Sequence, residues 1–209
     1  LYTNFTQIVA ADGSGVAKLA DLKGKRVSVG APNSGTEIIA VRMLEAAGLD
    51  AEKDITRERL GAAESAGALK DRKLDAFFWS GGLPTAAVTD LVNTPGLKVR
   101  LLPNEDVIDK LVAKYGPLYF KTTIPKASYQ GMEADVAVTG VANILVVGDK
   151  MDLDLAYAIT KAMHDNKAQL DAVHPEAKRL TPETAVVGSS IPFHPGAIKF
   201  YQEKGVWKG

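Results

Sequence analysis

The chain has 209 residues, and its 25 basic and 25 acidic residues give a formal net charge of zero. Hydrophobic residues make up 46% and charged residues 24%, as in an ordinary soluble globular protein, and no basic stripe typical of nucleic-acid binders is present. The absence of cysteine excludes disulfides, zinc–cysteine sites and thiol nucleophiles. Apolar runs stay well below the roughly 18 residues of a membrane helix, so we expect no membrane-embedded segment.

The first part of the chain predicts strands and one well-defined helix. Residues 6–11 predict a short apolar strand, residues 19–22 a brief helical turn and residues 26–30 a second strand. Apolar residues at helical spacing predict a helix over 35–47, and Gly48 is a natural stop after it.

The middle of the chain alternates between helix and strand patterns. Helices are predicted over 62–73, 86–93 and 105–116, and strands over 74–80 and 96–103. This alternation indicates an α/β fold with a mainly parallel sheet and crossover helices.

A change of composition at 117–137, which is rich in Pro, Gly and Lys, predicts an irregular segment between two lobes. One or two strands are predicted over 137–148, and the apolar run 141–147 within them is expected to be a buried strand. Residues 153–173 predict one long amphipathic helix, and a last short helix is expected to begin near Pro195.

The turn GAPNSGTE at 30–37 has the residues of an anion-binding helix start. Ser34 and Glu37 have capping-box spacing, with Glu37 expected to reach back to the amide of residue 34. The amides of Gly35 and Thr36 would then point outward at the positive end of the helix dipole, and the Thr36 hydroxyl would add a donor. The alternative is a capped helix without a ligand. Phosphate is disfavoured because neither a P-loop lysine nor a G-x-G-x-x-G motif is present.

A second turn of the same kind follows the strand at 74–80. The residues Trp79–Gly82 lead into a helix that begins at Pro84 and Thr85. Two such junctions are expected at the same carboxyl edge of a parallel sheet, which is where open α/β sheets bind ligands. Trp79 is either a core residue or the apolar wall of that pocket.

Catalytic and metal-binding patterns are not recognisable in the sequence. His164 lies inside the predicted long helix, and His174 and His194 are both followed by proline, which favours helix ends or turns over a catalytic base. No zinc-protease, nucleophile-elbow or clustered-carboxylate motif occurs. We therefore expect a binding protein, with no enzyme activity, metal or cofactor.

Four segments together resemble the substrate-binding subunits of the TAXI family of TRAP (tripartite ATP-independent periplasmic) transporters. They lie in family order and read LADLKGKRVSVGAPNSGTE, LDAFFWSGGLPTAAVTDL, LVAKYGPLYFKTTIPKASYQG and IPFHPGAIKFYQEKGVW. The resemblance implies an α/β fold like that of type II periplasmic binding proteins, with two lobes, parallel-rich sheets, crossover helices and hinge strands. It assigns 1–11 to a hinge strand and the remnant of lobe 1, 12–137 to lobe 2, and 138–209 to the return strand and C-terminal helices of lobe 1.

The resemblance also implies a function. A bacterial protein of this family captures a small carboxylate such as glutamate or a 2-oxoacid and delivers it to a membrane permease. We expect a monomer that is periplasmic or exported and binds no nucleic acid. Family members carry a further N-terminal segment of about 100 residues, which implies that half of the ligand contacts lie outside this chain.

Carried over to this sequence, the resemblance predicts two groups of ligand-binding residues and two weaker candidates beside the hinge strand. These are Asn33, Ser34, Gly35 and Thr36, then Trp79, Ser80, Gly81 and Gly82, and finally Tyr2 and Asn4. Two alternatives stay open from the sequence: an enzyme on the same two-lobed scaffold, and the ligand-sensing module of a regulator.

Overall fold

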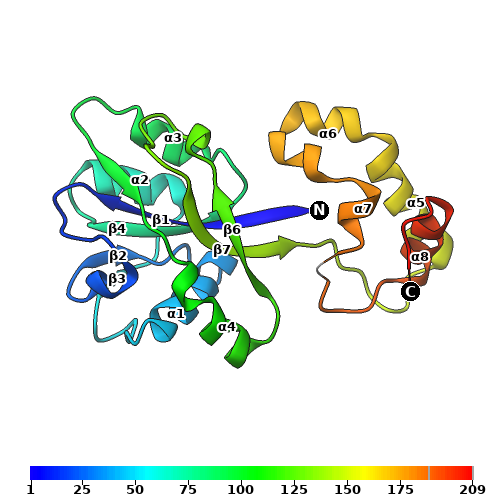
Figure 1. Cartoon of the computed structure of the whole chain (residues 1–209), viewed down its shortest axis with the longest axis horizontal. Helices are drawn as coiled ribbons and strands as arrows, with labels where there is room; N and C mark the ends of the chain where they lie inside the picture. Colours follow the sequence, from blue (N-terminus) through cyan, green and yellow to red (C-terminus); the bar gives the residue numbers. More distant parts are fainter. Residues whose placement is uncertain (188, 209) are drawn as a thin grey trace. The chain divides into compact units, whose positions relative to one another are not determined.

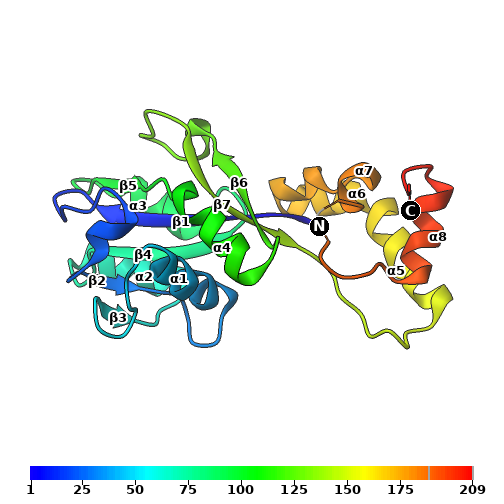
Figure 2. The same cartoon turned by 60° about the horizontal axis from the view of Figure 1, so that its bottom comes forward.

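The computed structural model describes residues 1–187 and 189–208. The chain divides into two compact units. The sheet unit comprises Asn4–Val141, and the helical unit comprises Leu1–Thr3 together with Ala142–Gly209. Figures 1 and 2 show the sheet unit in blue to green and most of the helical unit in yellow to red.

Among the described residues, seven strands form one sheet in the order β3-β2-β4-β1-β7-β6, and β5 pairs with β1 outside this path. The strands are β1 (Tyr2–Ala11), β2 (Arg26–Ser28), β3 (Thr56–Glu58), β4 (Ala76–Gly81), β5 (Val99–Leu101), β6 (Tyr119–Ile124) and β7 (Val136–Asn143). β2 runs parallel to both β3 and β4, whereas β1 runs antiparallel to β4 and β5, and β6 antiparallel to β7. The predicted α/β class is confirmed, with a mixed sheet whose parallel part is β3-β2-β4.

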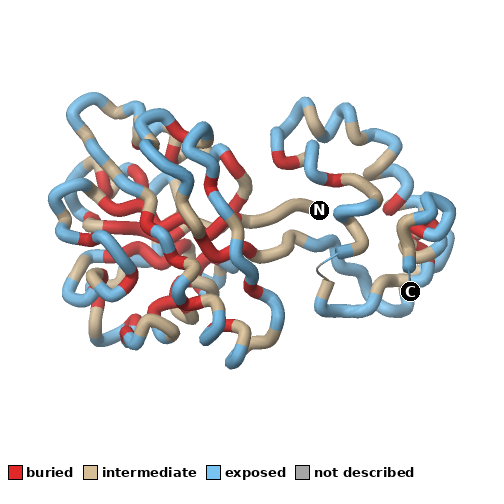
Figure 3. The backbone as a smooth tube through the Cα atoms, in the orientation of Figure 1, coloured by how far each residue is buried: buried red, intermediate tan, exposed pale blue. Residues whose placement is uncertain are grey.

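Helices cover both faces of this sheet, as Figure 2 shows. They are α1 (Gly35–Ala46), α2 (Ala62–Lys70), α3 (Ala86–Val92) and α4 (Ile108–Tyr115), with short 3-10 turns at Leu19–Leu22, Glu105–Val107 and Lys126–Ser128. On β1, Ile8 and Ala10 enter the core cluster that contains residues of α1 and α4, whereas Phe5 and Val9 enter the cluster that contains residues of α2 and α3. Alternating residues of the central strand β1 thus contribute to two cores, one on each face of the sheet. In Figure 3 most of the buried residues, coloured red, lie in the sheet unit.

The segment 117–137, predicted to be irregular, contains β6 and part of β7, so that prediction is wrong for these residues. β6 is hard to recognise because only its first and last residues are buried, while the four residues between them, including Phe120, are exposed or half-buried. Its backbone pairs with β7 from Ile124–Val136 to Tyr119–Val141. The partner strand, rather than an apolar pattern, defines β6. The three-residue strand β3 was also not predicted.

The apolar run 141–147 is not one buried strand. β7 ends at Asn143, and the following residues Ile144–Val147 have exposed fractions between 36% and 58%. The ladder with β6 ends at Val141. Residues 141–143 are strand but only half-buried, so the prediction of burial is wrong for the whole run and the prediction of a strand is wrong beyond Asn143. A run of apolar residues forms a strand only where another strand pairs with it.

The helical unit contains α5 (Leu153–Asp165), α6 (Lys167–Val173), a 3-10 turn (Pro175–Arg179), α7 (Pro182–Ala185) and α8 (Pro195–Glu203). The single helix predicted over 153–173 is two helices that break at Asn166. There the Ala162 carbonyl accepts from both the backbone amide and the side-chain amide of Asn166, at 3.0 and 2.8 Å. The last helix begins at Pro195, as predicted. Its Phe200 and Tyr201 are buried, and α8 packs against α5.

Candidate functional site

The two predicted junctions meet at the carboxyl edge of β2 and β4. β2 leads through Gly30, which has a φ of 99°, into the turn before α1. β4 ends at Ser80 and Gly81, and the Ser80 amide donates a hydrogen bond of 3.3 Å to Thr36 Oγ1. Thr36 was predicted as a hydroxyl donor; in this structure its oxygen accepts a bond from the second junction. One side chain therefore joins the two turns.

The start of α1 is capped largely as predicted. Ser34 Oγ accepts from the Glu37 amide at 3.1 Å. The Glu37 carboxylate, however, accepts from the Asn33 amide at 2.7 Å rather than from the amide of residue 34, which corrects that detail. Asn33 adopts a φ of 61°, which turns its amide toward the carboxylate.

The first amides of α1 face open space. Gly35 and Thr36 occupy the first two helical positions, where backbone N–H groups have no intrahelical acceptor. Gly35 is exposed, and a Cβ placed on it would meet no atom within 4 Å. Thr36 is buried beside it. The backbone donors of this turn are thus accessible from the Gly35 side.

Glu37 is the centre of a charged cluster that the sequence analysis did not identify. Its carboxylate accepts from Arg59 at 2.6 and 3.1 Å and from Arg57 at 2.5 Å, and its side chain is only 9% exposed. Hydrogen bonds from Arg59, followed by those from the Asn33 amide and Arg57, lower the pKa of Glu37 to about 2. The two arginines have the period-2 spacing of side chains on one face of a strand.

Replacing Glu37 with glutamine is expected to lower the unfolding free energy at pH 7 by about 1–3 kcal/mol, because two arginines lose a charged partner. The pKa of Glu37 is lower in the folded chain, so its contribution is present above about pH 4.5 and is lost as pH falls toward 2. The variant and the native chain should therefore converge in acid. Urea unfolding followed by circular dichroism at pH 7, 4.5 and 3 measures this difference.

Glu45→Gln provides the matched control for this prediction. Glu45 lies on the same helix and also pairs with a cation, Lys114, but its side chain is 51% exposed. Water and salt screen such a pair, so its loss should change stability much less. Equal effects of the two substitutions at pH 7 would contradict the special role assigned to Glu37.

Trp79 and Ser80 lie on opposite faces of β4. Trp79 is half-buried, its ring covers Gly81, and its Nε1 donates to Thr85 Oγ1 at 3.0 Å. Thr85 Oγ1 also accepts from Gln7 Nε2 at 3.0 Å, and Tyr129 OH donates to Gln7 Oε1 at 2.6 Å. Trp79 thus belongs to a hydrogen-bonded network on the α2–α3 face, whereas Ser80 lies on the α1 face.

The other predicted residues take different positions around this edge. The Gly82 carbonyl accepts from Thr85 Oγ1 at 3.0 Å, which fixes the start of α3. Asn4 precedes Phe5, the residue paired with Gly81 in the β1–β4 ladder. Tyr2 opens β1 and belongs to the helical unit by its contacts.

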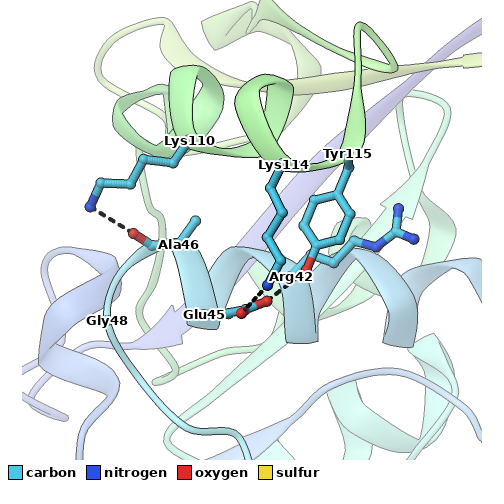
Figure 4. A pocket seen from close by; sticks show the side chains of 7 residues that line it. All are labelled: Arg42, Glu45, Ala46, Gly48, Lys110, Lys114 and Tyr115. Atoms are coloured by element: carbon cyan, nitrogen blue, oxygen red, sulfur yellow. Dashed lines mark hydrogen bonds and ion pairs between the residues drawn. The ribbon is translucent and has the colours of Figure 1, made fainter.

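A cavity of about 280 Å³ lies elsewhere, between the C-terminal ends of α1 and α4. Figure 4 shows that Lys114 and Tyr115 donate to Glu45, and that Lys110 donates to the Ala46 carbonyl at the end of α1. The remaining charged residue, Arg42, donates to Tyr119 OH at 2.8 Å. Lysines at helix C-termini stabilise the dipole there. The cavity therefore has a structural explanation and is separate from the α1 N-terminus.

The histidines take the structural roles predicted for them. His174 Nδ1 accepts from the Glu176 amide at 3.2 Å, and His194 Nδ1 accepts from the Gly196 amide at 3.1 Å, so both cap helix starts. His164 stacks on Phe200, and burial lowers its pKa. Within 1–187 and 189–208, no group of three or more acidic or histidine side chains is placed to hold a metal ion. No helix in the same ranges has the length and apolar character needed to span a membrane.

Comparison with known proteins gives one family and several distant structures. The model of the NMT1-like family matches residues 1–205. The chain is similar to the periplasmic aliphatic sulphonate binding protein SsuA from Escherichia coli, with 18% identity over 95% of this chain and 54% of that chain, at a TM-score of 0.41. It is also similar to the probable amino-acid ABC transporter extracellular-binding protein ytmK from Bacillus subtilis, with 19% identity, 91% and 62% coverage and a TM-score of 0.42.

A third similar structure is an ancestral arginine-binding protein bound to glutamine. Its identity to this chain is 17%, with 86% of this chain and 59% of that chain covered, at a TM-score of 0.43. The chain thus spans between 54% and 62% of the length of these three proteins.

Proposed function

We propose that this chain, which belongs to the NMT1-like family, forms part of the solute-binding subunit of a TRAP-type transporter of the TAXI family. In this proposal the protein captures a small carboxylate, such as glutamate or a 2-oxoacid, outside the cytoplasm. It then delivers the solute to a membrane permease and catalyses no reaction. The four motifs that resemble TAXI proteins support this assignment, together with the geometry of the α1 junction.

The observation that carries the proposal is the open N-terminus of α1. Its first amides and the helix dipole favour an anion, and Gly35 leaves room for a ligand to approach the backbone. A carboxylate fits this turn better than a phosphate group, since the P-loop lysine is missing.

We further propose that residues 12–137 form one lobe of a two-lobed binding protein, and that 1–11 and 138–209 belong to hinge strands and the other lobe. The other lobe, lobe 1, would supply the remaining ligand contacts, and closure of the two lobes would exclude water from the bound solute. The protein would act as a monomer with one small ligand.

A thermal-shift screen with the full-length protein tests this function. L-glutamate, 2-oxoglutarate and succinate are compared with glucose, glucose 6-phosphate and ATP. A carboxylate present at about 100 times its Kd adds about 2.7 kcal/mol to stability, which corresponds to a rise in Tm of roughly 5–10 °C. Stabilisation by the phosphate compounds only, or turnover of a stabilising ligand, would contradict the proposal.

A matched pair of glycine substitutions locates the ligand. Gly35→Leu fills the approach to the α1 amides, whereas Gly67→Leu adds the same side chain to an exposed helical position on α2, where the added Cβ also meets no atom within 4 Å. The carboxylate-dependent shift should disappear in the first variant and persist in the second. Equal shifts in both would place the ligand away from α1.

A further inference from the structure

Arg59 lies at the carboxyl edge of the sheet, one strand beyond the α1 junction. It directly follows β3, whose last residue, Glu58, pairs with Ser28 of β2. The Glu58 carbonyl also accepts from the Val29 amide at 2.9 Å, so the ends of β2 and β3 remain adjacent where both strands finish. No sequence pattern marks Arg59, although the residue before it, Glu58, pairs with the strand that leads into the turn at Gly30.

The Glu37 carboxylate fixes the guanidinium of Arg59 beside the first turn of α1. Arg59 Nη2 and the Asn33 amide donate to the same oxygen, Glu37 Oε2, at 3.1 and 2.7 Å. Arg59 Nε donates to the other oxygen at 2.6 Å. Nη1 makes no hydrogen bond to any of the described residues, and the side chain is 45% exposed. A positioned guanidinium thus keeps a free donor beside the turn proposed to bind the solute.

Arg57 differs from Arg59 in both exposure and partners. Its side chain is 19% exposed, and it is held between Glu37 and Glu52. The cluster therefore holds two carboxylates and two guanidinium groups, and Arg59 is the more exposed of its two arginines. Arginine offers planar paired donors that match a carboxylate.

Two buried hydroxyl groups near this edge, on the same face of the sheet, have no hydrogen-bond partner within the described ranges. Thr6 is 1% exposed, and its Oγ1 has no hydrogen-bond partner within the described ranges; the same holds for the buried Ser80 Oγ. Thr6 pairs directly with Ser80, and Ser80 contacts Thr36 of α1. Thr6 lies on the same face of β1 as Ile8 and Ala10, which belong to the core cluster that contains residues of α1. Buried hydroxyls without partners are rare and require an explanation.

We propose that Arg59 is the residue that selects solutes by charge. An oxyanion on the solute is held by the free donors of Arg59 on one side and by the α1 amides on the other. Glu37 acts as a positioning residue, because its two carboxylate oxygens hold the Arg59 guanidinium in place. The inference rests on the function proposed above and narrows its ligand to a solute whose anionic group faces the β3 side of α1.

The experiment uses the full chain with 2-oxoglutarate and its neutral dimethyl ester as probes, and titration calorimetry as the measurement. The native chain should bind the anion and prefer it strongly over the ester. Arg59→Gln should weaken binding of 2-oxoglutarate roughly 10- to 100-fold, the effect expected for a charged hydrogen bond, and should leave ester binding nearly unchanged. Arg59→Lys should recover part of the loss, because the charge remains while the paired donors do not.

Arg100→Gln is the matched control. Arg100 is 51% exposed and also paired with an acid, Asp12, but it lies on β5. Its loss removes the same charge and should change the affinity for 2-oxoglutarate less than twofold. The Tm of each variant without ligand separates a folding defect from a binding defect, and Arg59→Lys repeats the test if Arg59→Gln is unstable.

Several outcomes would overturn the inference. Arg59→Gln binding 2-oxoglutarate within twofold of the native chain, or equal binding of ester and anion by the native chain, would exclude charge selection by Arg59. Stabilisation by a neutral solute such as glucose would still support a solute-binding function, but it would refute the selection of anionic solutes by Arg59. Absence of binding by every solute of either charge would refute the proposed function itself.

Discussion

Replacing Gly30 with alanine is expected to destabilise the sheet unit by about 2–5 kcal/mol and to disrupt the α1 junction. Gly30 has a φ of 99°, a conformation that costs an L-residue about 1–2 kcal/mol. A Cβ there would also lie 2.8 Å from Cβ and Cγ2 of Thr36, and such overpacking adds about 1–3 kcal/mol. Because Thr36 joins the two junctions, the strain should reach Ser80 as well.

Hydrogen exchange resolved by segment measures this effect within the sheet unit. Amides of α1 and of the end of β4 should exchange faster in Gly30→Ala, while those of α5 and α8 keep their native rates. Gly35→Ala is the control five residues away, because it has a helical conformation and free space around the added methyl group. Native exchange rates in α1 of Gly30→Ala would show that the turn tolerates a side chain.

The second large effect is expected in the helical unit, where Gly196→Ala should separate α5 from α8. A Cβ on Gly196 would overlap the Leu153 carbonyl oxygen and lie 2.7 Å from the Tyr157 amide nitrogen. Both are backbone atoms of α5, so no side-chain rotation relieves the contact, and we expect the loss to reach or exceed the roughly 1–3 kcal/mol typical of overpacking.

Limited proteolysis with circular dichroism tests this expectation. Cleavage should begin within 153–203 of Gly196→Ala at protease concentrations that leave the native chain intact. Gly148→Ala is the control in the same unit, since its added methyl group meets no atom within 4 Å. Native resistance of Gly196→Ala would mean that α8 can shift along α5 without loss of packing.

The helices were predictable because their signals are local. Ser34 and Glu37 mark the start of α1, and Pro195 marks the start of α8, within a few residues of sequence. The strands β3 and β6 were not, because their residues alternate weakly and depend on partner strands distant in sequence. The break at Asn166 interrupts the predicted helix, and helical periodicity does not reveal it.

In the candidate site too, local features were predictable from the sequence and contacts between distant residues were not. The cap at Ser34 was predictable from spacing, whereas the partners of Glu37 lie 20 and 22 residues later, one in β3 and one directly after it. Two arginines at such a short strand give no sequence pattern that distinguishes them from surface residues. For Trp79, the sequence left open whether the side chain is in the core or lines a pocket. Only the folded chain shows which face of β4 this residue occupies.

The hydrogen-bonded network around Trp79 has an experimental consequence. The chain has two tryptophans, and the other, Trp207, belongs to the helical unit. With Trp207 replaced by phenylalanine, the indole of Trp79 at the end of β4 becomes the single tryptophan, two residues before Gly81 of the second junction. Its hydrogen bond to Thr85 makes its emission sensitive to the start of α3. The protein thus carries its own optical probe at the sheet edge, and the proposed solute binding can be tested there without a label.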